Sequence, residues 1–153
     1  MLVASIVPAA ETAAVRQARE QVEFVRKLAE AGAASRKQVE QAAAGLQQAQ
    51  DDALIAETLD ARVAVEDLTE EQSTEATSAA TRRLQRLQKR LAEQAVLVGQ
   101  GVAPRTSLVP FEEEIESARR IVDAMEVRAR SLAEIASMIR APIVIEWLRI
   151  VSM

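Results

Sequence analysis

Apolar residues recur along most of this chain at alternating steps of three and four. That spacing places them on one face of an α-helix, and it is typical of coiled coils, whose apolar stripe packs against a neighbouring helix. Four segments carry the pattern, at residues 11–31, 35–66, 69–99 and 106–139. The stripes therefore predict an all-α protein built from four long helices.

The stripes differ in the size of their side chains. The second is mostly alanine: Val39, Ala42, Leu46, Ala49, Ala53, Ala56 and Val63. The fourth has larger residues and no break: Leu108, Phe111, Ile115, Ala118, Val122, Met125, Ala129, Leu132, Ala136 and Ile139. Each added buried methylene contributes about 0.8 kcal/mol. We therefore expect the second half of the chain to be the more stable, and the first half to need a covering surface from the second half or from another chain.

A glycine followed by a capping box separates the first helix from the second. Gly32 can end a helix, and Ser35 with Gln38 three residues later forms a Ser-x-x-Gln box that opens the next one. Thr69 and Gln72 form a similar box, which predicts the start of the third helix.

Glycine and proline also delimit the second turn. The third helix should end at Gly99 and Gly101. Pro104 and Pro110 then confine the start of the fourth helix to residues 106–109, because proline is tolerated only in a first helical turn.

The second half of the chain repeats the first at an offset of 69 residues, which superposes Gly101 on Gly32 and Arg105 on Arg36. The same offset superposes most positions of the apolar stripes, for example Leu46 on Ile115. Agreement between turns and stripes indicates a tandem duplication of an antiparallel coiled-coil hairpin. We expect hairpin 1 at residues 11–67 and hairpin 2 at residues 69–140, arranged as a bundle or as two extended hairpins.

Antiparallel pairing predicts which residues face each other. In hairpin 2, Leu91 should face Ile115 and Leu87 should face Ala118. The same register sets five basic residues of the third helix opposite five acidic residues of the fourth. These are Arg82, Arg83, Arg86, Lys89 and Arg90, and Glu112, Glu113, Glu114, Glu116 and Asp123. Opposite charges should therefore flank the seam.

The composition removes several function classes. The net charge is −4, which argues against nucleic-acid binding, since that needs a concentrated basic face. The chain has no cysteine and no histidine, so the usual zinc ligands, thiol nucleophiles and the commonest general base are missing. Ser35 and Ser107 are better explained as caps, and the acidic clusters as solvated helix faces. We expect no enzyme activity, no metal and no cofactor.

The two ends are apolar. Residues 2–7 (LVASIV) precede Pro8, as at the end of a signal peptide, although no basic segment comes before them. We expect residues 1–10 to be a signal-peptide remnant and the protein to be periplasmic or secreted; an irregular N-terminus is the alternative, and the lack of cysteine is also compatible with the cytoplasm. Residues 141–153 form an apolar C-terminal tail, too short to cross a bilayer, through which alone membrane contact is expected.

The first turn, KLAEAGAASRKQVEQAAAGLQQAQDDA from Lys27, resembles the hairpin tip of periplasmic adaptor (membrane fusion) proteins of efflux pumps. In that family an Arg, a Leu and a Ser at fixed spacing contact the outer-membrane channel. Leu28 and Ser35 match this spacing, while Phe24 holds the Arg position. The second turn, LVGQGVAPRTSLVPFEEEIESA, is similar to helix turns of outer-membrane efflux channels. The resemblance covers the hairpins alone and implies contacts at their tips. The candidate interaction residues are Leu28, Gly32, Ser35, Arg36, Gly101, Pro104 and Arg105.

Residues 51–72, with ALIAETL and VEDLTEEQ, are also similar to the helical N-terminal region of secreted cell-wall peptidase-like proteins. Two functions follow as hypotheses. The chain is a non-enzymatic helical scaffold or protein–protein interaction module of the bacterial cell envelope, whose partner is a helical protein or a second copy. Alternatively, it is the accessory region of a peptidase-like enzyme whose catalytic domain lies outside this sequence.

Overall fold

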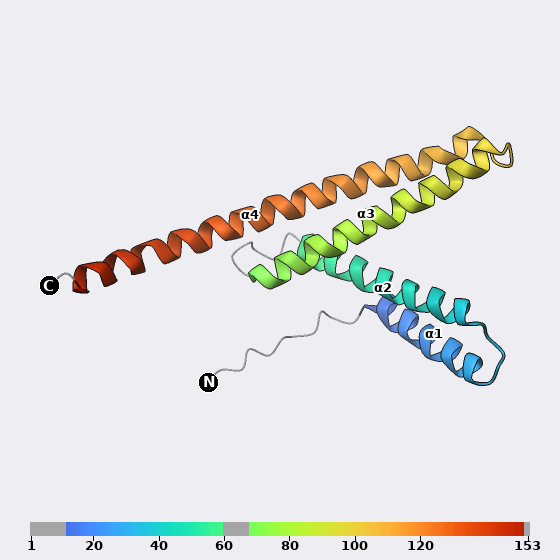
Figure 1. The fold of residues 1–153 in the computed structure, drawn as a ribbon, viewed down its shortest axis with the longest axis horizontal. Helices are drawn as coiled ribbons and strands as arrows, with labels where there is room; N and C mark the ends of the chain where they lie inside the picture. Colours follow the sequence, from blue (N-terminus) through green and yellow to red (C-terminus); the bar gives the residue numbers. More distant parts are fainter. Residues whose placement is uncertain (1–11, 60–67, 152–153) are drawn as a thin grey trace. The chain divides into compact units, whose positions relative to one another are not determined.

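The computed structural model describes the backbone of residues 12–59 and 68–151, and the side chains of residues 12–59 and 68–139. All regular structure in these ranges is helical (Figure 1). The α-helices are α1 (Ala13–Glu30), α2 (Arg36–Leu59), α3 (Glu70–Gly99) and α4 (Val109–Val151), and the 3₁₀ helix η2 (Arg105–Leu108) leads into α4. The all-α class is confirmed. The chain divides into two compact units, Met1–Asp60 and Ala61–Met153.

In the first unit, α1 and α2 run antiparallel and pack against each other (Figure 1). Thr12 caps α1, its hydroxyl accepting a hydrogen bond from the Val15 amide at 3.2 Å. Val15, Val22 and Val25 are the buried apolar residues of α1. The first stripe residues of α2 are only half-buried: Val39, Ala42, Leu46 and Ala49. Two of them are alanines, whose small side chains bury little apolar area against α1. The packing of this unit therefore depends mainly on valines.

The second half of α2 departs from the predicted stripe. Ala56 is exposed, whereas Ile55 is 3% exposed, and Asp51 and Thr58 are also buried. Isoleucine removes more apolar surface from water than alanine does, so the side of the helix that carries Ile55 gains more free energy from burial. The polar residues on this side have partners: Gln47 donates to Asp51 at 3.1 Å, and Thr58 donates to the Leu54 carbonyl at 2.8 Å. The prediction of Ala56 as a seam residue was wrong.

In the second unit, α3 and α4 run antiparallel and pack along each other (Figure 1). The buried cluster joins Leu87 of α3 to Ile115 and Ala118 of α4, with Leu84 and Leu91 packed against it. Larger residues thus fill this seam than fill the seam of the first unit, and the greater buried area favours the second unit.

The charges beside this seam are partly satisfied within single helices. Lys89 pairs with Glu93 at 4.0 Å, and Glu116 pairs with Arg119 at 2.6 Å. Both pairs have the three- or four-residue spacing that brings side chains together on one helix. Lys89 and Glu116 thus pair within their own helices, and the opposition of charges across the seam stays a prediction.

The helix ends agree with the predicted capping signals. Thr69 and Gln72 form a reciprocal capping box at the start of α3, which confirms that prediction. Pro110 lies in the first turn of α4, as expected for proline. α4 continues as far as Val151, so the apolar segment expected as a separate tail after residue 140 prolongs the helix. The proposed signal-peptide remnant at 1–10 and the expected end of the second helix near residue 66 lie outside the described residues.

Candidate interaction site at the two helix turns

The first turn ends α1 with four backbone hydrogen bonds. The amide of Ala31 donates to the carbonyl of Lys27 at 3.1 Å, and that of Gly32 donates to Ala29 at 3.0 Å. The amides of residues 33 and 34 both donate to the carbonyl of Leu28, at 2.7 and 3.2 Å. Gly32 has φ +74°, a left-handed conformation that glycine adopts without the cost imposed by a Cβ atom. The turn thereby satisfies carbonyls that the end of a helix would leave without donors.

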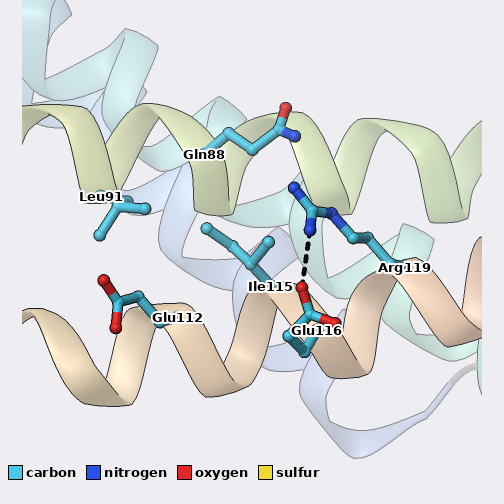
Figure 2. A pocket seen from close by; sticks show the side chains of 6 residues that line it. All are labelled: Gln88, Leu91, Glu112, Ile115, Glu116 and Arg119. Atoms are coloured by element: carbon cyan, nitrogen blue, oxygen red, sulfur yellow. Dashed lines mark hydrogen bonds and ion pairs between the residues drawn. The ribbon is translucent and has the colours of Figure 1, made fainter.

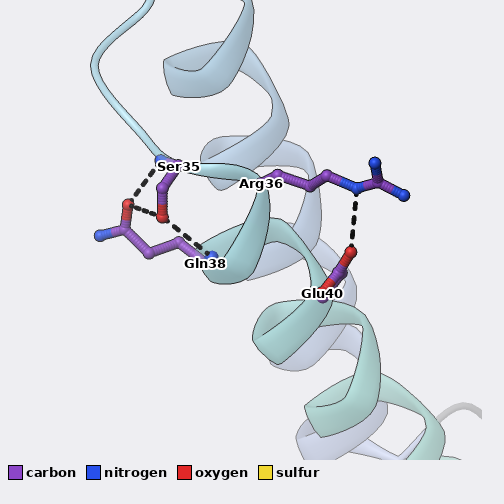
Figure 3. Close-up of polar contacts among 4 residues, drawn as sticks. All are labelled: Ser35, Arg36, Gln38 and Glu40. Carbon is purple, nitrogen blue, oxygen red and sulfur yellow. Dashed lines mark hydrogen bonds and ion pairs between the residues drawn. The ribbon is translucent and has the colours of Figure 1, made fainter.

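Ser35 and Gln38 open α2 (Figure 3). The Ser35 amide donates to Gln38 Oε1 at 2.7 Å, and the Gln38 amide donates to Ser35 Oγ at 3.3 Å, so the predicted capping box is confirmed. Beside it, Arg36 Nε donates to Glu40 Oε1 at 3.0 Å. This ion pair is exposed, with the Arg36 side chain 93% accessible, and such pairs stabilise a fold only slightly.

The second turn repeats the four backbone bonds of the first, each shifted by 69 residues. The donor and acceptor pairs are Gln100 to Val96 (3.0 Å), Gly101 to Val98 (3.0 Å), Val102 to Leu97 (2.9 Å) and Ala103 to Leu97 (3.3 Å). Gly101 has φ +73°, within one degree of Gly32. The next bond also recurs, since the amide of Ser107 donates to Pro104 at 3.0 Å as that of Gln38 donates to Ser35 at 3.0 Å. The two turns therefore share these backbone hydrogen bonds; they differ in the next segment, since α2 is α-helical from Arg36 whereas residues 105–108 form the 3₁₀ helix η2.

Side chains close the second turn differently. Pro104 and Ser107 occupy the positions of Ser35 and Gln38, so the capping box is missing there. Instead, Ser107 Oγ donates to the Pro104 carbonyl at 2.7 Å and accepts a hydrogen bond from Gln94 Nε2 on α3 at 2.9 Å. The amide of Gln94 thus connects α3 to η2 across the turn.

The candidate interaction residues fall into two sets, one in each unit. Leu28 is half-buried, and Gly32, Ser35 and Arg36 are exposed in the first turn. Gly101, Pro104 and Arg105 are exposed in the second. Leu28 contributes its carbonyl to the turn and Ser35 its hydroxyl to the cap, so both also have structural roles.

Sequence reasoning missed a group of exposed apolar side chains at the second turn. We call it the apolar tip; its members are Val96 (57% exposed), Leu97 (40%), Val102 (70%) and Val109 (47%). At the first turn, Phe24 is similarly exposed (57%). Neighbouring apolar side chains left in water are typical of interaction surfaces. The repeat offset could have found part of this group, since it places Leu97 on the candidate residue Leu28.

An open groove between α3 and α4 is a second concave feature of this unit (Figure 2). Leu91 and Ile115 provide its apolar atoms, and the other lining residues are Gln88, Glu112, Glu116 and Arg119. Glu116 and Arg119 bind each other within the lining (Figure 2). Small-molecule sites enclose most of their ligand, whereas this groove is the solvent side of the helix seam. The turns are the better candidate site.

Among the described residues there is neither an acidic cluster for a metal ion nor a membrane-spanning helix. Within residues 12–59 and 68–139, no group of three or more aspartate or glutamate side chains is arranged to hold a metal ion. In the described part of the chain, no helix combines the length and the apolar content needed to cross a bilayer.

Comparison of the chain with protein-family models, with curated proteins and with solved structures finds no match. Its function is therefore argued from its own geometry.

Proposed function

We propose that the chain is a non-enzymatic helical interaction module of the bacterial cell envelope, in which two tandem copies of a helical hairpin present their turns to a helical protein partner. One observation carries this proposal: the two turns form the same backbone hydrogen bonds at one offset of 69 residues, and the second turn has exposed apolar side chains at residues 96, 97, 102 and 109.

The matching turns support the tandem duplication. Many helices end at a glycine with backbone hydrogen bonds of this kind, so one such turn alone would carry little weight. Here the offset that relates the bonds is also the offset that relates seam residues, such as Leu46 and Ile115, and the arginines Arg36 and Arg105. Three independent features that share one offset favour duplication over convergence.

The exposed tip residues support an interaction role over a purely connecting one. A connecting turn needs only glycine and polar residues, and exposed valines gain nothing in water. At a binding surface, the same side chains release their hydration water against a partner. The apolar tip is thus explained by a partner protein that covers it.

Two features support location in the cell envelope. The apolar run at residues 2–7 has the character of a signal peptide, and the turns resemble the hairpin tips of efflux-pump adaptors and channels. Contact with the membrane would be confined to residues 141–153 in this proposal.

Photo-crosslinking in the cells that naturally make the protein tests the interaction role. A photo-crosslinking amino acid replaces Leu97 in one variant and Gln85, an exposed residue in the middle of α3, in the control. The proposal predicts a covalent adduct with a defined protein from position 97 and none from position 85. No adduct from position 97, or equal adducts from both positions, would contradict it.

A further inference from the structure

The two turns share their backbone hydrogen bonds but present different surfaces. The offset of 69 residues places Val96 on Lys27, Val102 on Ala33 and Val109 on Glu40. The second turn has therefore exchanged a lysine and a glutamate for exposed valines. Between residues 94 and 111 its only charged residue is Arg105.

The loss of the glutamate changes the state of the arginine. In the first copy, Arg36 pairs with Glu40 at 3.0 Å. In the second copy, Val109 stands where that carboxylate would be, and Arg105 forms no ion pair with any residue in the described part of the chain. Arg105 is exposed, so its guanidinium is available to an external acid.

Resting on the proposed function, we propose that the second turn binds a protein surface that carries a carboxylate among apolar side chains. Arg105 contacts the carboxylate, and the apolar tip covers the surrounding apolar area. Guanidinium binds carboxylate through two parallel hydrogen bonds, which gives both strength and geometry. Arginine is also one of the residue types enriched among the energetically dominant residues of interfaces.

The second turn is prepared for binding by its internal bonds. Gln94 fixes Ser107 from α3, Ser107 fixes the Pro104 carbonyl, and the ring of Pro104 restricts the backbone next to Arg105. A surface that is already ordered loses less conformational entropy when a partner docks.

A protein surface fits this turn better than an anionic membrane does. Recognition of lipid headgroups from the membrane surface relies on clusters of about four to eight lysines and arginines. The apolar tip is accompanied by one arginine, which suits a single carboxylate on a partner protein.

The test measures the adduct that forms from a photo-crosslinking residue at position 102 in whole cells, in four backgrounds. Arg105→Ala removes the cation, Arg105→Lys keeps the charge but not the paired geometry, and Val109→Glu restores the internal carboxylate of the first copy. Arg130→Ala is the control: Arg130 lies on α4 away from both turns, is exposed and pairs with Glu126 at 3.6 Å. The three substituted positions, 105, 109 and 130, are exposed, and circular dichroism checks that each variant keeps its helices.

We expect the adduct to fall about tenfold in Arg105→Ala, which corresponds to about 1.4 kcal/mol of binding free energy. Val109→Glu should lower it similarly, Arg105→Lys less, and Arg130→Ala not at all. The partner peptide found by mass spectrometry should contain an acidic residue within an apolar segment.

Three outcomes would overturn the inference. An undiminished adduct in Arg105→Ala and Val109→Glu would refute the role of Arg105 while leaving the proposed function intact. Absence of any adduct at both positions 97 and 102 in the parent protein would instead refute the proposed function itself. Arginine-dependent flotation with phosphatidylglycerol vesicles, without a protein adduct, would assign the turn to a membrane surface.

Discussion

On α3 the apolar stripe of Leu84, Leu87 and Leu91 is followed by a polar residue, Gln94, which donates a 2.9 Å hydrogen bond to Ser107 in η2. Both side chains are half-buried. The polar residue that interrupts the stripe is therefore the one that connects the third helix to the turn.

Removing either partner of this bond should destabilise the second unit. A hydrogen bond of this kind contributes about 0.5–1.5 kcal/mol, so Gln94→Ala and Ser107→Ala should each lower the unfolding free energy by about 1 kcal/mol. Chemical denaturation of the single and double variants measures the coupling between them, and we expect about 1 kcal/mol. Gln85→Ala, at an exposed position of the same helix, should change stability by less than about 0.5 kcal/mol. Additive effects of the two substitutions would show that the bond contributes nothing.

The glycines divide into two classes with opposite responses to alanine. Gly32 and Gly101 have φ +74° and +73°, and a Cβ atom added to either would meet no atom within 4 Å. Gly32→Ala and Gly101→Ala should therefore cost only the left-handed backbone conformation, about 1–2 kcal/mol in each case. Each loss of melting temperature is compared with the melting temperature of the unit that contains the glycine. Equal losses would show that the two glycines have the same backbone conformation.

Gly45 is the control for this pair. It lies inside α2, and a Cβ atom there also meets nothing within 4 Å. Gly45→Ala should stabilise the protein by about 0.5–1 kcal/mol, because alanine is the better helix former. Destabilisation by Gly45→Ala, or stabilisation by Gly101→Ala, would contradict the backbone assignment.

The second unit should be the more resistant to local opening. Leu87, Ile115 and Met125 are buried in it, while the offset of 69 matches them with Ala18, Leu46 and Ala56 in the first unit. Greater apolar burial raises the free energy of local opening, which amide hydrogen exchange reports. We expect slower exchange at residues 80–91 and 111–125 than at residues 15–28 and 39–53. Faster exchange in the second unit would show that seam volume does not set its stability.

Features encoded by a few neighbouring residues could be predicted from the sequence. The capping boxes at Ser35 and Thr69 need only two residues three apart, and both form as expected. The heptad stripes indicated helices because their period is a local property of the chain. Leu87, Ile115 and Ala118 pack in one cluster, as the predicted register expects, because the stripes of α3 and α4 are continuous in this region.

Features that depend on competition between faces could not be predicted in this way. In α2, alanines on one face and Ile55 on another are both compatible with the period, and the larger side chain is the one buried. The apolar tip was missed because Val96, Val102 and Val109 lie beside a glycine turn, where periodicity carries no information. Comparison of the two hairpins residue by residue at the offset of 69, rather than stripe by stripe, would have placed these three valines on Lys27, Ala33 and Glu40.

The most direct test grafts the first turn into the second. Residues 96–109 are replaced by a copy of residues 27–40, which the offset of 69 makes equal in length, with a photo-crosslinking residue at position 97. If the turns share one backbone and differ in their binding surface, the graft keeps the helical content of the parent protein and loses its adduct at position 97. Loss of helical content, or an undiminished adduct with the same partner, would contradict the assignment of binding to the apolar tip.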